Sequence, residues 1–250
     1  MKKIFAFLFF LNLSCFAQKD TLKYKIMLNN QKIGFSWLFR PAQTDFRSFM
    51  QTSDGTKIYA KYRLNADQIM TELDISGKDK NVISEKFKLE NGTARWVING
   101  VLKEVKAVSA LYLPQTETMD NVLTRALLTS PTKKVFVLPA AVEASTFIAY
   151  ELTLRNKQKA FLFQINGLNV KPTFDWVDEN SYSFGKFTDE KIIIREGYEE
   201  YISEFVRLQK MSEIKALKEI AKQTTAKNPS QMPAKITKIV AKKKVIHKKS

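Results

Sequence analysis

The chain has 250 residues, a formal net charge of +16, one histidine and one cysteine. His247 and Cys15 lie near the two ends, so residues 18–226 contain neither residue type. Histidine is the usual general base and metal ligand near neutral pH, and cysteine is the usual soft ligand and thiolate nucleophile. The composition therefore excludes a Ser-His-Asp triad and most hydrolytic or redox sites. We expect no catalytic residue, no metal and no cofactor in this part of the chain.

Residues 1–17 have the pattern of a cleaved export signal. Two lysines precede an apolar run over residues 4–13, and Cys15-Phe16-Ala17 places small residues three and one positions before Gln18. The apolar run is shorter than the roughly 20 residues of a membrane-spanning helix. We therefore predict cleavage after Ala17 and a periplasmic or secreted protein. The alternative is a lipoprotein with its lipid on Cys15, although the residues before this cysteine do not match the usual pattern.

The next hundred residues alternate between apolar and polar side chains, with the period of two that is typical of a β-strand. One face of residues 57–64 is apolar (Ile58, Ala60, Tyr62 and Leu64), and the other is mostly cationic. Asn29-Asn30, Asp54-Gly55, Asn91-Gly92 and Asn99-Gly100 provide turns. The pattern predicts strands at residues 24–28, 32–39, 46–51, 57–64, 68–75, 82–89 and 94–98. Because the connections are short, we expect antiparallel pairing.

Helical spacing first appears between Thr116 and Thr129, where apolar residues recur at intervals of three or four before Ser130-Pro131. Further strands are predicted at residues 135–138, 146–154, 160–165, 173–177, 182–187 and 191–195. A long amphipathic helix is predicted from Tyr198 to Lys222, with one apolar stripe that packs on the sheet. The fold class is therefore α+β, a mostly antiparallel meander that forms a curved sheet or partial barrel. We predict a single domain over residues 18–222.

Residues 223–250 are predicted to be a disordered, lysine-rich tail. Eight lysines and no acidic residue lie between Lys227 and Ser250, whereas the rest of the mature chain is only mildly basic. We expect these lysines and His247 to be solvated, and the alternative is weak contact with an anionic surface. Since the basicity is concentrated in this tail and in the signal, we do not expect nucleic-acid binding.

Two sets of residues are candidates for a site. Asp175 and Asp178 could act as paired carboxylates, but residues three apart point to opposite faces of a regular strand, so a shared acid/base site would need a bulge. A solvated strand end with a local ion pair is the simpler interpretation. Phe161, Phe163 and Trp176 could line an apolar pocket, although such residues are more often part of a core.

A series of motifs resembles the non-catalytic, β-rich N-terminal region of exported bacterial amidohydrolase-family proteins. The series includes Gly77-Lys78-Asp79, Glu85-Lys86-Phe87, Asn91-Gly92-Thr93-Ala94-Arg95-Trp96, Arg125-Ala126-Leu127-Leu128, Leu138-Pro139-Ala140, Ile165-Asn166-Gly167-Leu168, Trp176-Val177-Asp178 and Ile194-Arg195-Glu196-Gly197-Tyr198-Glu199. In that family a metal-dependent (β/α)₈ barrel follows, and its His-x-His strand has no counterpart here. The resemblance implies either an accessory domain whose partner is a separate amidohydrolase catalytic domain, or a truncated amidohydrolase.

The leading hypothesis is thus an exported, non-catalytic accessory or binding domain. The alternative is a periplasmic binding or carrier protein for an apolar ligand, enclosed between the curved sheet and the long helix and in contact with Phe161, Phe163 and Trp176. A third hypothesis is an enzyme that uses only carboxylates, with Asp175 or Asp178 involved.

Overall fold

The computed structural model describes residues 21–42, 44–79, 81–107, 109–116 and 122–227. The predicted export signal and most of the predicted tail lie outside these residues. Among the described residues, none of the helices is both long and apolar enough to cross a bilayer.

The first eight strands form a chain of antiparallel hairpins. The backbone at Asn29-Asn30, Asn91-Gly92 and Asn99-Gly100 adopts positive φ angles, which tight two-residue hairpin turns require. The strands are β1 (Thr21–Leu28), β2 (Gln31–Phe39), β3 (Asp45–Thr52), β4 (Lys57–Leu64), β5 (Met70–Lys78), β6 (Val82–Glu90), β7 (Thr93–Ile98) and β8 (Val101–Lys106). Alternation decides which side chains are buried, as in β4, where every second residue is buried.

The second half of the chain contributes the remaining strands and the helices that the structure describes. The strands are β9 (Leu111–Tyr112), β10 (Lys134–Leu138), β11 (Val142–Thr153), β12 (Lys159–Asn166), β13 (Thr173–Asp178), β14 (Ser183–Phe187) and β15 (Lys191–Arg195). The helices are α2 (Val122–Thr129) and α3 (Ile202–Lys227), and the short 3₁₀ helix η1 (Glu199–Tyr201) precedes α3. Every strand pair is antiparallel except β9 with β10.

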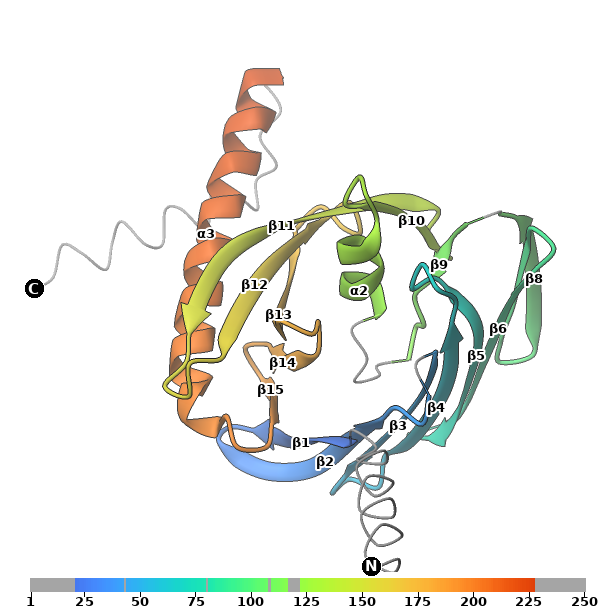
Figure 1. The fold of residues 1–250 in the computed structure, drawn as a ribbon, viewed down its shortest axis with the longest axis horizontal. Helices are drawn as coiled ribbons and strands as arrows, with labels where there is room; N and C mark the ends of the chain where they lie inside the picture. The colour runs from blue at the N-terminus through green and yellow to red at the C-terminus, as the bar shows by residue number, and fades with distance from the viewer. Residues whose placement is uncertain (1–20, 43, 80, 108, 117–121, 228–250) are drawn as a thin grey trace, which may run out of the picture.

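All fifteen strands belong to one sheet, in the order β8-β7-β6-β5-β4-β3-β2-β1-β15-β14-β13-β12-β11-β10-β9. The pairing of β1 with β15, with Tyr24 opposite Arg195, joins the two halves of the chain. The sheet curls into an open roll (Figure 1), and its two edge strands, β8 and β9, do not pair with each other within the described residues.

Side chains close the roll where hydrogen-bonded strands do not. Tyr112 of β9 stacks on Phe87 of β6 with ring centroids 4.6 Å apart, and its hydroxyl donates to the Glu85 carboxylate at 2.7 Å. The backbone N–H groups of Gln115 and Thr116 also donate to this carboxylate, at 3.0 and 3.2 Å. Glu85 is 1 % exposed, so one buried side chain fastens the β9 end of the sheet to the inner face of β6.

Two hydrophobic cores lie on opposite sides of the sheet. The inner core fills the roll and includes Val122, Leu123, Ala126 and Leu127 of α2. The outer core lies between α3 and the outer face of β12 to β15, and it includes Trp176, Phe184, Ile194, Phe205 and Leu208. Figure 1 shows α2 within the curl and α3 along its outside.

The predicted fold class is confirmed: the molecule is a mostly antiparallel, curled β-sheet with one short internal helix and a long C-terminal helix. Strands β8 and β9 were not predicted. The internal helix begins at Val122, since Thr116 is not helical and residues 117–121 lie outside the described part. Helix α3 continues to Lys227, five residues into the stretch predicted as a tail.

Candidate functional site

The structure does not bring together the three residues of the predicted apolar pocket. Phe161 and Phe163 lie on the inner face of β12, with ring centroids 6.4 Å apart. Trp176 faces Leu162 across the β12–β13 pair, so it lies on the outer face. It is fully buried there against Phe205 of α3, with centroids 4.6 Å apart. Trp176 is therefore a core residue beneath α3 and is separated from the two phenylalanines by the sheet.

Asp178 has a structural role. Its carboxylate accepts a hydrogen bond from the Arg195 guanidinium at 2.8 Å, and the two side chains are 4 % and 9 % exposed. The same carboxylate accepts from the backbone N–H groups of Asn180 and Tyr182, at 2.9 and 2.8 Å. A carboxylate engaged in this way stabilises a turn and its ion pair. The simpler interpretation of the sequence included an ion pair but placed it at a solvated strand end, whereas this pair is buried.

Asp175 lies elsewhere, on the inner face of β13. Its carboxylate accepts a hydrogen bond from the Thr124 hydroxyl of α2 at 2.5 Å. Thr124 is 1 % exposed, so this contact fixes α2 against the wall of the roll. Asp175 and Asp178 thus have different partners, and no shared acid/base site joins them.

Beside Asp175, strands β13 and β14 no longer pair, and this division interrupts the wall of the roll. Strands β13 and β14 pair at Trp176 with Gly185 and at Val177 with Ser183, and the register shifts between these two pairs. Thr173 to Asp175 pair with β12 on one side and have no described strand pairing on the other. A cavity of about 550 Å³ lies at this division.

The cavity draws its lining from both sides of the sheet. Asp175 and Thr124 contribute from inside the roll, Lys186 from β14, and Gln209 and Glu213 from α3. The Gln209 amide donates to the Phe187 carbonyl at 3.1 Å and to the Glu213 carboxylate at 2.8 Å, which fixes both α3 side chains at the cavity. The remaining lining is mostly apolar and includes Leu113, Pro114, Val122, Leu123, Ile165, Pro172, Phe174 and Phe187.

This arrangement is suited to binding. An apolar wall with a few polar groups that converge on one point is the usual composition of a small-molecule site. Within the described residues, no group of three or more histidine, cysteine, aspartate or glutamate side chains could hold a metal ion. The polar groups of the cavity can bind a hydrogen-bonding or charged group of a ligand, and its apolar surface can bury the rest.

This cavity was not predicted from the sequence, although Gly185 marks its end. A Cβ atom on Gly185 would lie 2.1 Å from the carbonyl oxygen of Ile193, so only glycine permits this close approach of β14 to β15. The Ser183 hydroxyl also accepts from the Gly185 N–H at 3.1 Å, at the register shift. A glycine inside a predicted strand is a known sign of a bulge or a close approach, and here it indicates where the regular pairing ends.

No family model matches, and no curated protein matches. Among solved structures, the chain is similar to a beta-barrel-like protein of the domain of unknown function DUF1849 from Brucella abortus, with 11 % identity and a TM-score of 0.44. The similarity covers 70 % of this chain and 94 % of that chain.

The resemblance to the N-terminal region of amidohydrolases is wrong. No family model supports the motif series, and the Brucella abortus structure is described as a beta-barrel-like protein of a domain of unknown function, not as an amidohydrolase region. The expected partnership with a separate amidohydrolase catalytic domain and the truncated-enzyme interpretation depended on that resemblance, so both are withdrawn with it.

Proposed function

We propose that this chain is an exported, non-catalytic binding protein whose ligand is a mainly apolar small molecule with one amino or hydroxyl group. The single observation that supports the proposal is the cavity at the division between β13 and β14. Its volume of about 550 Å³ lies within the range of roughly 300–1,000 Å³ that is typical of small-molecule sites.

The polar groups indicate what the ligand would carry. Asp175 and Glu213 contribute two carboxylates to the lining, against one ammonium group from Lys186. This excess of acceptors favours a ligand with a hydrogen-bond donor or a positive charge. The apolar lining would bury the remainder of the molecule, which agrees with the carrier hypothesis in the kind of ligand but not in its location.

The neutral aromatic amine N-phenyl-1-naphthylamine is a suitable probe, because it combines an apolar ring system with one N–H donor. Titrated into the full chain, it should give a saturable, one-to-one rise in fluorescence. Thr173 is exposed and lines the cavity. We expect Thr173→Trp to fill the cavity and weaken binding at least about tenfold, a loss of roughly 1.4 kcal/mol.

Thr153→Trp is the matched control, since Thr153 is an exposed threonine of β11 that does not line the cavity. Its affinity should equal that of the unmodified chain. An absence of saturable binding, or equal weakening by both substitutions, would contradict a site between β13 and β14. Native mass spectrometry of protein from its own host would then identify the natural ligand through its mass.

A further inference from the structure

Aromatic side chains form a row across the outer face of β2, β3 and β4. Trp37, Phe49 and Tyr59 occupy facing positions on these strands. The ring centroid of Phe49 lies 5.9 Å from that of Trp37, 4.6 Å from Tyr59 and 5.7 Å from Phe35. Phe49 is only 8 % exposed because its neighbours cover it, whereas Phe35 and Tyr59 are 40 % and 51 % exposed. Together, Phe35, Trp37, Phe49 and Tyr59 form the aromatic row.

The row borders a hollow on the side of β1. A cavity of about 480 Å³ there is lined by Phe35, Trp37 and Phe39 together with two cations, Lys23 and Lys32, and one carboxylate, Glu196. Lys23 faces Trp37 across the β1–β2 pair. The aromatic surface and the positive charges therefore occupy the same part of the wall.

Cations flank the row on its other sides. Lys57 and Lys61 lie two positions before and after Tyr59 on β4, Arg47 faces Lys61, and Lys78 faces Lys57. Among the described residues, none of these four cations or Lys23 forms an ion pair. Asp74 faces Lys61 across the β4–β5 pair, but its carboxylate pairs with Lys86 at 3.6 Å.

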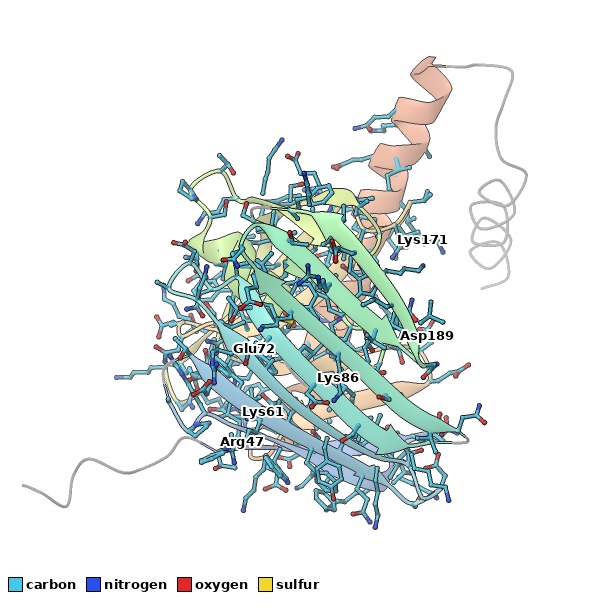
Figure 2. All side chains as sticks on the ribbon, turned by 90° about the vertical axis from the view of Figure 1, so that its right-hand side faces the viewer. Arg47, Lys61, Glu72, Lys86, Lys171 and Asp189 are labelled. Carbon is cyan, nitrogen blue, oxygen red and sulfur yellow. The ribbon has the colours of Figure 1, made fainter. Side chains whose placement is uncertain are left out.

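The neighbouring part of the same face is arranged differently. Arg63 pairs with Asp45 at 2.9 Å and with Glu72 at 3.1 Å, and Arg95 pairs with Glu104 at 2.5 Å. Figure 2 shows Arg47, Lys61, Glu72 and Lys86 on successive strands of this face. Charge is thus compensated within the protein away from the aromatic row and left uncompensated beside it. Uncompensated cations around an exposed apolar row are complementary to an anion that also has an apolar surface.

We propose that the aromatic row and its flanking cations bind a linear acidic polysaccharide, a chain of uronic acids. The apolar faces of the sugar rings would stack on Trp37 and Tyr59, while the carboxylates would pair with Lys23, Lys57 and Lys61. With strands about 4.8 Å apart, the distance from β1 to β5 is about 19 Å, which is enough for several consecutive sugar rings.

The curvature of the wall favours a flexible chain over a bilayer. Strands β1 to β5 follow the curl of the roll (Figure 1), and the aromatic row with its flanking cations runs across these strands, around the convex outside. A plane touches a convex wall along a narrow strip only, so a flat membrane cannot contact the whole row. A polysaccharide can bend around it.

An octamer of galacturonic acid, titrated into the full chain, tests the proposal through tryptophan fluorescence. Trp96 and Trp176 are 7 % and 0 % exposed, so a change in emission reports on the partly exposed Trp37. We expect saturable binding that weakens as the salt concentration rises. Tyr59→Ala should lower the affinity roughly three- to tenfold, and Tyr59→Phe, which keeps the ring, should bind like the unmodified chain.

Charge-reversed variants provide a second test of the proposed site. Lys57→Glu combined with Lys61→Glu should lower the affinity about tenfold. Lys103→Glu combined with Lys171→Glu changes the net charge equally, at exposed lysines away from the row, and should leave the affinity within about twofold. This control separates the proposed site from general attraction, including that of the lysines beyond residue 226.

Three results would overturn the proposal. The first is equal weakening by the two charge-reversed pairs, which would mean non-specific attraction. The second is unchanged affinity in Tyr59→Ala. The third is binding to phosphatidylglycerol vesicles, dependent on Tyr59, without any binding of the octamer, because this would make the face a membrane-contact surface.

Discussion

At the scale of single residues, Arg195 shows how a buried charge is accommodated. Its guanidinium donates to the Asp178 carboxylate at 2.8 Å, to the Tyr182 carbonyl at 2.8 Å and to the Ser183 carbonyl at 2.6 and 3.0 Å. It also lies over the Phe184 ring, 4.6 Å from its centroid. One side chain of β15 thus fixes the turn between β13 and β14. Strand β14, which follows this turn, borders the candidate cavity.

Arg195→Met removes these hydrogen bonds and leaves the Asp178 carboxylate buried without its cation. We expect a loss of about 3–5 kcal/mol in the free energy of unfolding, measured by urea denaturation. Adding Asp178→Asn should recover part of this loss, because the uncompensated charge is then gone. A loss below about 1 kcal/mol in the single variant would show that the pair contributes little.

Tyr24 predicts how stability depends on alkaline pH. Burial raises the pKa of Tyr24 to about 12, although the Arg195 guanidinium opposes the shift. An unfolded tyrosine has a pKa near 10, so between about pH 10 and 12 the unfolded chain loses a proton that the folded chain keeps. The free energy of unfolding therefore falls as the pH rises through this window.

Tyr24→Phe should remove this contribution. Between pH 9 and pH 11, the unmodified chain should lose about 1 kcal/mol more than Tyr24→Phe. Urea denaturation of both proteins at each pH measures the difference. Equal losses in the two proteins would contradict the raised pKa. Burial and the hydrogen bond to Glu85 also raise the pKa of Tyr112, but that residue is present in both proteins and cancels in the comparison.

At the scale of elements, local pattern predicted most strands because alternation and turn residues are both local signals. The Asn91-Gly92 turn and the alternating β4 are examples. Strand β8 was missed because all six of its residues are exposed, so no buried face produces an alternation. Strand β9 was missed because it has only two residues, and its position depends on the distant Glu85 and Phe87.

Glu85 is the residue through which this distant contact can be tested. Its carboxylate accepts hydrogen bonds from the Tyr112 hydroxyl and from the backbone of Gln115 and Thr116. Glu85→Ala should lower the free energy of unfolding by about 2–4 kcal/mol, because three buried or half-buried donors lose their acceptor. Glu90→Ala is the control on the same strand, since the Glu90 carboxylate is half-exposed and, among the described residues, its ion pair is with Lys88. We expect its effect to stay within about 0.5 kcal/mol in the same urea experiment, and similar losses in the two variants would contradict the role of Glu85.

At the scale of the whole molecule, the candidate cavity could not be predicted from the sequence. Alternation places Phe161 and Phe163 on the same face of β12. Whether Trp176 lies on that face depends on the pairing register of β12 with β13, which places Trp176 opposite Leu162 and therefore on the other face. The cavity further requires that β13 and β14 separate, that α2 enters the roll and that α3 covers the outside. These arrangements depend on residues far apart in the sequence. The local signal for them is Gly185, a glycine inside a predicted strand.

The two cores share one wall, and this determines how the molecule should unfold. Ile193 and Ile194 are consecutive and fully buried, yet the first belongs to the inner core and the second to the outer core. Such strands contribute alternate residues to the two cores. If they unfold, both cores lose side chains at the same time. We therefore expect one cooperative unit, with both cores lost in a single transition.

Two variants with one tryptophan each would test this expectation. Trp37→Phe with Trp176→Phe leaves Trp96, which belongs to the inner core, and Trp37→Phe with Trp96→Phe leaves Trp176, which belongs to the outer core. In urea, the fluorescence midpoint of each variant should coincide with its own midpoint from far-ultraviolet circular dichroism, which follows the sheet. If Trp176 became exposed at a lower urea concentration than the loss of the sheet, α3 would detach independently. The outer core would then be a separate layer added to a self-sufficient roll, because the wall alone would hold the inner core together.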